Sequence, residues 1–291
     1  MTNDELRRIT EHIIELPAAP IIVTQILDLI DDPTTSASLL ARLLSSDQAL
    51  TARILKLANS SYYAFAKPIR TVQLAISLLG FQTVANLGLS LAFTRSFTGA
   101  HYEDDFDRLA FWEHALSVAV TARGLARDFG YATGAELFTM GILHDIGKLI
   151  IHEYLHDRYM LVESRLRLYD ETSSEAERHV LGVDHAEIGG WLCNSWRLPE
   201  EIEQAVGAHH APSTSDNEYA CVVHMANHVC NRIQHAWPMV DHRDAEFDLI
   251  CLQRLPLRLT DDGDVDWDRY DQLAADEITK ASEFITLIQN V

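Results

Sequence analysis

Apolar side chains recur at helical spacing along most of the chain, and this pattern limits the possible folds more than any other feature. In residues 72–79 they fall at positions i, i+3, i+4 and i+7, with Thr71 suited to cap the N-terminus and Gly80 to end the helix. Alternating apolar and polar runs are scarce, although residues 249–259 could hold a short strand or hairpin arm. The pattern therefore predicts an essentially all-α protein.

Capping signals give the expected helix boundaries. Residues 108–129 are predicted to form one long helix between Asp107 and Gly130. A capping box of Thr133 and Glu136 predicts a helix that runs to about Tyr154. Other helices are expected to begin at a capping box of Ser174 and Glu177 and end at Gly182, and to begin at Asp184 with Glu187 three residues on. Pro199 fits the first turn of a further helix. Asp47 precedes a helix that carries Leu50, Ile54 and Leu57, and residues 217–234 are also expected to be helical.

The chain carries many more acidic than basic side chains, which restricts its partners. Its 291 residues include 43 Asp and Glu against 23 Lys and Arg, for a formal net charge of −20. A surface of that sign repels phosphate backbones and anionic lipid, so non-specific nucleic-acid binding is disfavoured. Hydrophobic residues make up 47% of the chain, which is enough to build a core and excludes disorder as the main state.

Several features predict a cytoplasmic protein. No window approaches 18 uncharged apolar residues, so neither a membrane-spanning helix nor a membrane partner is expected. The first ten residues lack the apolar stretch of a signal peptide. The four cysteines form no CxxC pair and no regular framework, which favours reduced thiols.

Polar breaks in the pattern predict the domain organisation. An acidic break at residues 98–107 separates an N-terminal array of helices from the block that follows, and residues 10–97 are expected to pack on a lobe that begins near residue 107. The expected units are an N-terminal helical lobe (1–100), a second helical lobe that carries the candidate site (101–235) and a C-terminal extension (236–291).

The strongest local signal for chemistry is the pair His144–Asp145, which the helix pattern places in the middle of a helix among apolar residues. Burial of two such polar groups costs free energy unless a partner satisfies them. A divalent transition metal is one such partner, because imidazole and carboxylate are ligands for Fe, Mn, Zn or Ni. Lys148 lies three residues after Asp145, on the same helix face, and could bind a phosphate.

Four other histidines lie on or beside neighbouring predicted helices and could bind the same metal as His144 and Asp145. They are His114 on the preceding helix, His185 in the first turn of a capped helix, and His209 and His210 at the end of a further helix. Because the ligands of one metal or a close metal pair lie within about 5 Å of one another, we expect His144 and Asp145 that close to His114 and to His185 or His209.

A second histidine pair gives a weaker signal. His224 and His228 lie four residues apart on the predicted helix 217–234, a spacing at which two imidazoles can chelate a metal. The same spacing is common on ordinary amphipathic helices, so we expect a structural role for this pair.

These residues, together with several longer stretches, resemble the HDOD branch of the HD-domain superfamily of metal-dependent phosphohydrolases. The stretches that carry the resemblance are LPAAPIIVTQILDLIDDP (16–33), SSDQALTARILKLANSSYY (45–63), TVQLAISLLGFQTVANLGL (71–89), FWEHAL (111–116), GILHDIGKL (141–149), GVDHAEIGGWL (182–192) and WRLPEEIEQAVGAHHAP (196–212). They follow the family's order across about residues 10–230. The resemblance implies a two-lobed all-α fold that occurs in bacterial signalling proteins, often as an output module.

The related HD-GYP branch, which hydrolyses cyclic di-GMP at a site of two or three metals, implies a ligand set. The residues that match its ligand positions are His114, His144, Asp145, His185, His209 and His210. The chain departs from that branch in three places: it reads APSTSDN (211–217) where the branch has a Gly-Tyr-Pro loop, Asn227 stands at the position of its last ligand Asp, and Ala110 stands at a Glu position. The chain therefore keeps the histidines and loses carboxylates.

Two functions remain open from the sequence. In the first, the chain is a regulatory module that acts on a signalling protein partner in trans and keeps a carboxylate-poor metal site. In the second, it is a metal-dependent phosphohydrolase for a nucleotide or cyclic dinucleotide, with Asp145 bridging two metals and Lys148 binding the phosphate. The site could also be a vestigial polar core whose histidines bond to one another and to water. The low number of acidic ligands favours the regulatory module.

Overall fold

The computed structural model describes residues 19–32, 34–60, 62–96, 106–132, 134–233 and 247–282. In these ranges the chain forms helices joined by turns and loops and contains no strand, and an isolated β-bridge joins Leu259 to Val265. The predicted all-α fold is confirmed. Across the same ranges, we find no helix with both the length and the apolar character needed to cross a membrane.

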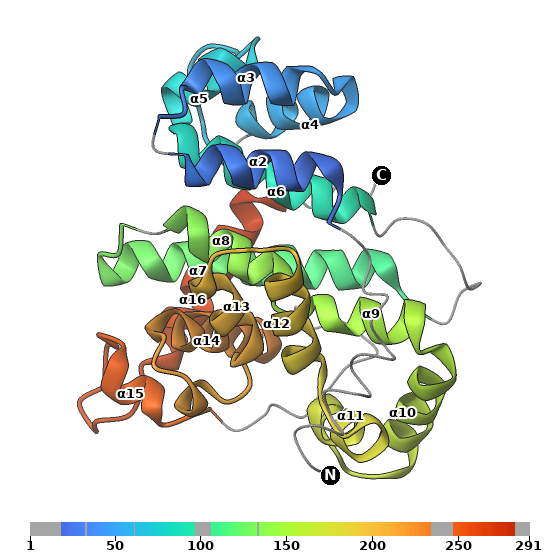
Figure 1. Ribbon diagram of the computed structural model, residues 1–291. Helices are drawn as coiled ribbons and strands as arrows, with labels where there is room; N and C mark the ends of the chain where they lie inside the picture. The colour runs from blue at the N-terminus through green and yellow to red at the C-terminus, as the bar shows by residue number, and fades with distance from the viewer. Residues whose placement is uncertain are drawn as a thin grey trace.

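The helices at the N-terminal end pack on one another (Figure 1). They are α2 (Ile21–Asp31), α3 (Ala37–Ser45), α4 (Gln48–Ala58), α5 (Val72–Leu79) and α6 (Phe81–Ser96). Helix α6 contacts the other four and is the centre of this group. The side chains of Asp47 and Thr71 accept hydrogen bonds from backbone N–H groups at the starts of α4 and α5, as predicted.

A second group of helices is built on α7 (Arg108–Phe129), which Asp107 caps and Gly130 ends in a left-handed conformation, as predicted. The other members are α8 (Gly134–Leu143), α9 (Ile146–Tyr154), α10 (His156–Leu168), α11 (Ser173–Leu181), α12 (His185–Ser195), α13 (Glu200–Gly207), the 3-10 helix η1 (Pro212–Thr214), α14 (Glu218–Arg232), α15 (Ile250–Arg254) and α16 (Trp267–Lys280). Helices α8, α14 and α16 all pack on α7, so most of its side chains are buried.

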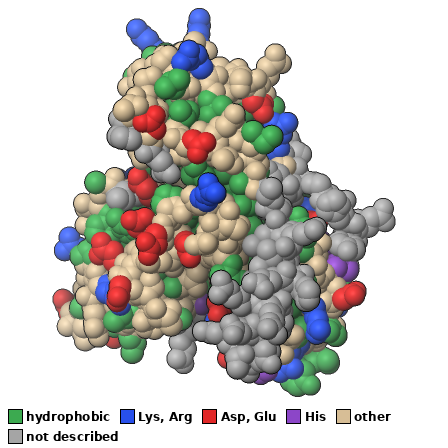
Figure 2. Space-filling model, in the orientation of Figure 1, with side chains coloured by type: hydrophobic (Ala, Val, Ile, Leu, Met, Phe, Trp, Pro, Cys, Tyr) green, Lys and Arg blue, Asp and Glu red, His purple; other side chains and the backbone are tan. Residues whose placement is uncertain are grey.

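The two groups of helices meet where α6 packs on α8. The division into units 1–100, 101–235 and 236–291 stays a prediction, because its boundaries fall in residues 97–105 and 234–246, outside the described residues. Figure 2 shows Asp and Glu side chains spread over the face in view, in keeping with the formal net charge of −20.

The predicted single helix from Thr133 to Tyr154 is wrong. Helix α8 ends at Leu143 and α9 begins at Ile146, so His144 and Asp145 lie in a turn between two helices and not in the middle of one. The break changes the direction of the chain, so that α8 packs on α7 whereas α9 packs on α12. Thr133 lies outside the described residues.

The predicted capping box of Ser174 and Glu177 is also wrong. Thr172 caps α11 and forms the box with Glu175, two residues earlier than expected, although Gly182 ends the helix as predicted. Glu177 is therefore not needed at the helix start, and its buried side chain lies against α12 instead. In the stretch 249–259, which could have held a short strand or hairpin arm, Ile250–Arg254 form the short helix α15. Among the described residues of this stretch, the last one, Leu259, makes a β-bridge.

Two glycines that flank the His144–Asp145 turn allow neighbouring helix backbones to approach closely. A Cβ atom at Gly147 would lie 2.0 Å from the carbonyl oxygen of His185, and one at Gly141 would lie 2.5 Å from the Cα of Ala119. Neither contact is possible for any other residue without a shift of the backbone. Gly141 therefore allows α8 to approach α7, and Gly147 allows α9 to approach the start of α12.

We expect Gly147→Ala to destabilise the protein by about 2–3 kcal/mol, because the added methyl group meets backbone and not a side chain that can move. Gly134→Ala is the matched control, since a Cβ there meets only side-chain atoms at 3.5 and 3.9 Å in a helix. The control should be neutral or stabilising by up to about 1 kcal/mol. Urea unfolding of both variants measures the difference, and equal stabilities would contradict the close approach of α9 to α12.

Candidate metal centre

Separate elements of the second group bring the predicted ligand residues together. They are His114 on α7, His144 and Asp145 in the turn between α8 and α9, His185 as the first residue of α12, and His209 and His210 just after α13. They form two groups, one of Asp145, His185, His209 and His210 and one of His114, His144 and Asp145. Within each group every residue offers one ligand-type atom, and these atoms all lie within 4.8 Å of one another. Asp145 is common to both groups. We refer to these six residues as the His/Asp cluster.

The Asp145 carboxylate lies at the middle of the His/Asp cluster. Its Oδ1 is 3.1 Å from Nε2 of His185 and 3.6 Å from Nε2 of His209. Its Oδ2 is 3.4 Å from Nε2 of His144 and 3.8 Å from Nε2 of His114. His144 and Asp145 therefore lie close to His114, and Asp145 lies close to both His185 and His209, while the ring centroids of His144 and His209 are 5.1 Å apart, which confirms the predicted approach of about 5 Å.

His144 and His209 are oriented as metal ligands usually are. The Nδ1 atoms of His144 and His209 lie 2.8 Å from the carbonyl oxygens of Gly141 and Val206, and a carbonyl can only accept, so each Nδ1 donates its proton. Each Nε2 then carries a lone pair, and within the described part of the chain neither of these buried atoms has a hydrogen-bond partner. Burial lowers the pKa of His144 well below its usual value and that of His209 to about 4, so both rings are neutral at pH 7.

Glu177 positions His185, a role that the sequence analysis missed. One oxygen of Glu177 accepts from the backbone N–H of His185 at 2.7 Å and lies 2.6 Å from its Nδ1. Burial lowers the pKa of His185, but the negative charges of Glu177 and Asp145 outweigh it and raise that pKa to about 9. On the other side of the ring, Nε2 lies 2.8 Å from Nε2 of His210. The missed signal was the Thr172–Glu175 capping box, which leaves Glu177 free for this contact.

The Lys148 side chain is buried and contacts the carboxylate of Asp145. Its Nζ donates to Oδ2 of Asp145 at 2.7 Å. Both residues are buried, with Lys148 9% and Asp145 1% exposed. Burial raises the pKa of Asp145, but the positive charges of Lys148 and His185 beside it outweigh burial and hold that pKa well below its usual value. The two side chains lie three residues apart and in contact, and the role of Lys148 in binding a phosphate stays a prediction.

His224 connects the cluster to the C-terminal part of the chain. Its Nδ1 donates to the carbonyl oxygen of His209 at 2.7 Å, and its Nε2 accepts from the backbone N–H of Asp248 at 3.0 Å. Both ring nitrogens are therefore used, and the expected structural role is the one observed. The ring of His228 packs against Phe247 and Trp267, with centroids 5.3 and 4.9 Å away.

Asn227, at the degenerate ligand position, lies on α14, which packs against α7, α8 and α13. Its side-chain oxygen is buried and has no hydrogen-bond partner among the described residues. An unsatisfied buried oxygen of this kind is a group that a metal or a water could satisfy.

The His/Asp cluster is closed to solvent. His144, His185 and His209 are fully buried, and Asp145 and His114 are 1% and 5% exposed. Of the six residues, all of which are described, only His210 is partly exposed. The arrangement can therefore hold a small ion inside the protein, and among its six residues His210 is the one that reaches the surface.

Comparison with known proteins agrees with this fold. An HDOD protein of unknown function from Geobacter sulfurreducens is 24% identical, with a TM-score of 0.76 over 97% of this chain and 95% of that chain. A candidate phosphohydrolase from Shewanella amazonensis SB2B is 23% identical, with a TM-score of 0.74 over 96% of this chain and 97% of that chain. At these identities the likeness shows the fold alone.

An uncharacterised protein of Treponema pallidum is 29% identical over 221 residues, which cover 72% of this chain and 40% of that protein. The matched region is thus about two fifths of this curated relative's length. The sequence profile of the HDOD domain matches residues 16–212, from the start of the N-terminal helices to just past the paired histidines. Because this match covers more than half of the chain, the protein belongs to the HDOD domain family.

Proposed function

We propose that the chain is a regulatory module of bacterial signal transduction whose His/Asp cluster holds a divalent transition metal without rapid hydrolysis. The observation that carries this proposal is the closed cluster in which Lys148 is bonded to the only carboxylate. In this proposal the module acts in the cytoplasm on a signalling protein supplied in trans. A phosphate or nucleotide that reaches the partly exposed His210 would be a regulatory ligand.

The residues present fit a divalent metal. Neutral His144 and His209 offer lone pairs at Nε2, and their Nδ1 atoms are fixed by backbone carbonyls, which is the usual support of a histidine ligand. Asp145 can contribute one oxygen to each of the two groups. Imidazole and carboxylate together suit Fe, Mn, Zn or Ni. Such a metal, when bound, would polarise a coordinated water and lower its pKa.

The charge of the His/Asp cluster argues for partial occupancy. Two divalent ions carry a formal charge of +4, whereas the one carboxylate of the cluster, that of Asp145, carries −1. Lys148 adds a further positive charge 2.7 Å from that carboxylate. Two ions would therefore need hydroxide or phosphate to balance them. One ion, or an incompletely filled site, is the state that this ligand set supports best.

Metal content should depend on the two positions that set this charge. Asp145→Asn is expected to abolish bound metal, because it removes the only carboxylate of the cluster. Asn227→Asp is expected to raise metal affinity, because an anion near a cation gains on the order of 4 kcal/mol per unit charge at 4 Å and an effective dielectric of 20, before desolvation is subtracted. Elemental analysis of the purified wild type and both variants tests this, and equal metal content in all three would rule out the metal site.

Glu177→Gln should weaken metal binding by about 10–100-fold, because the charged partner that orients the ring of His185 is lost. Glu175→Gln is the matched control on the same helix, since Glu175 is exposed and serves only the capping box. Competition with a fluorescent chelator measures both affinities. The positioning role of Glu177 fails if the two variants lose affinity equally.

Hydrolysis by the wild type should be slow. With Mn²⁺, Fe²⁺, Zn²⁺ or Ni²⁺ added, we expect bis(p-nitrophenyl) phosphate and p-nitrophenyl phosphate to turn over at less than about 0.1 s⁻¹, below the ~1–10³ s⁻¹ typical of enzymes. The reason is that the carboxylate is bonded to Lys148 inside a closed cluster. Turnover at 1 s⁻¹ or more that Asp145→Asn abolishes would support the alternative, a metal-dependent phosphohydrolase acting on a nucleotide or cyclic dinucleotide.

A further inference from the structure

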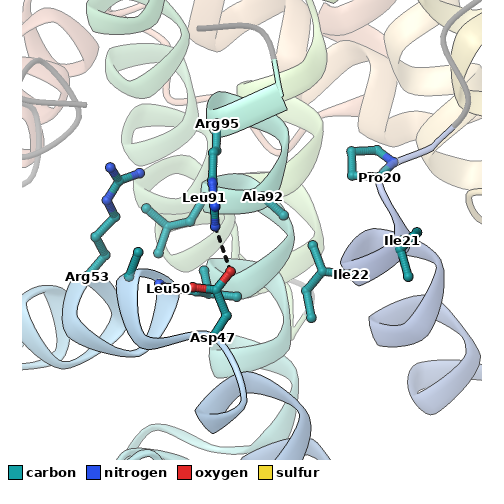
Figure 3. A pocket seen from close by; sticks show the side chains of 10 residues that line it. Pro20, Ile21, Ile22, Asp47, Leu50, Arg53, Leu91, Ala92 and Arg95 are labelled. Atoms are coloured by element: carbon teal, nitrogen blue, oxygen red, sulfur yellow. Dashed lines mark hydrogen bonds and ion pairs between the residues drawn. The ribbon is translucent and has the colours of Figure 1, made fainter.

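A pocket of about 360 Å³ lies in the N-terminal group of helices and uses no residue of the His/Asp cluster. Three elements form it: the start of α2, the first half of α4 and the last turns of α6 (Figure 3). Leu50, Leu91 and Ala92 form an apolar floor and are 5%, 2% and 4% exposed. This volume is within the range of about 300–1,000 Å³ in which proteins bind small molecules.

Two arginines stand at this pocket. Figure 3 shows Arg53 on α4 and Arg95 on α6, with Arg95 paired to Asp47 at 2.6 Å. Asp47 is held there because its carboxylate also caps α4 through the N–H of Leu50. Arg53 differs from Arg95, because among the described residues it has neither a hydrogen-bond nor an ion-pair partner.

The charge of the lining is opposite to that of the whole protein. Two arginines against one aspartate give a formal +1 at this pocket, whereas the chain as a whole carries −20. The start of α2 adds to this, because Pro20 at the N-cap provides no side-chain hydrogen bond and the first turn holds no acidic residue. An anion that enters the pocket therefore finds, beside an apolar floor, a guanidinium that no other described residue pairs with.

We propose that this pocket binds a small anion with an apolar body, a medium-chain carboxylate or alkyl phosphate, with its charged end at Arg53. The apolar part would lie on the floor, where burial of each CH₂ group is favourable. A free small molecule is favoured over an anionic bilayer, because the formal net charge of −20 on the whole chain repels an extended negative surface. The proposal is independent of the metal centre.

Calorimetric titration of the full chain with three probes of equal chain length tests this proposal. The probes are decanoate, decyl phosphate and decylammonium, each below its micelle concentration. We expect the anions to bind and decylammonium to bind at least tenfold more weakly, and the tighter of the two anions then identifies the headgroup. Equal affinity for all three probes, or none for either anion, would overturn the proposal.

Variants locate the binding. Arg53→Gln should raise the Kd of the anions about tenfold, because it removes a charge-assisted hydrogen bond. Arg42→Gln is the matched control, since Arg42 is exposed on α3, does not line the pocket and gives the same change in net charge. Ala49→Trp should abolish binding by filling the pocket from an exposed position that tolerates a larger side chain. Unchanged affinity in Arg53→Gln and Ala49→Trp, or an equal loss in Arg42→Gln, would place the ligand elsewhere and refute the site.

Discussion

The buried carboxylate of Asp145 is the group on which the centre of this structure depends. It is 1% exposed, and its neighbours are the ammonium group of Lys148 at 2.7 Å and the imidazole of His185 at 3.1 Å. A carboxylate in such a place destabilises a protein strongly unless cations and donors surround it. Removal of one of these partners would leave an uncompensated charge in the core, so the residues of the candidate metal centre are also residues that hold the second group of helices together.

The positions of these side chains depend on contacts far apart in the sequence. Gly147 allows α9 to approach the backbone of His185, and Glu177 then holds that histidine through both its N–H and its ring. On the opposite side, His224 joins the carbonyl of His209 to the backbone of Asp248. The cluster is therefore fixed from α9, from α11 and from the C-terminal segment, and a change in any of these would move a candidate ligand.

Local signals predicted the fold well wherever a helix end depends on its own residues. Asp107 and Gly130 bound α7 as expected, because a cap and a left-handed glycine act within one turn. The turn at His144–Asp145 was not predicted, because the apolar periodicity continues through it and the reason for the break is the packing of α9 on α12. The start of α11 was misplaced because Thr172–Glu175 and Ser174–Glu177 have the same spacing, and only the fold assigns Glu177 to His185.

The clustering of the histidines could be predicted, but the state of Lys148 could not. The sequence places Lys148 on the same face as Asp145, and its distance of 2.7 Å shows that the lysine neutralises the carboxylate directly. A metal bound at Oδ2, on the side of His114 and His144, would therefore have to compete with Lys148 for that oxygen, whereas Oδ1 faces His185 and His209. A metal at a free concentration of 100 times its Kd would add about 2.7 kcal/mol to the free energy of unfolding, because ligands from α7, α12 and the turn before α9 come together only in the folded protein. In the function proposed above, the core would be neutralised by Lys148 without a metal and by the metal when one is bound, and such an exchange would suit a regulatory module better than a catalyst that needs its metal permanently in place.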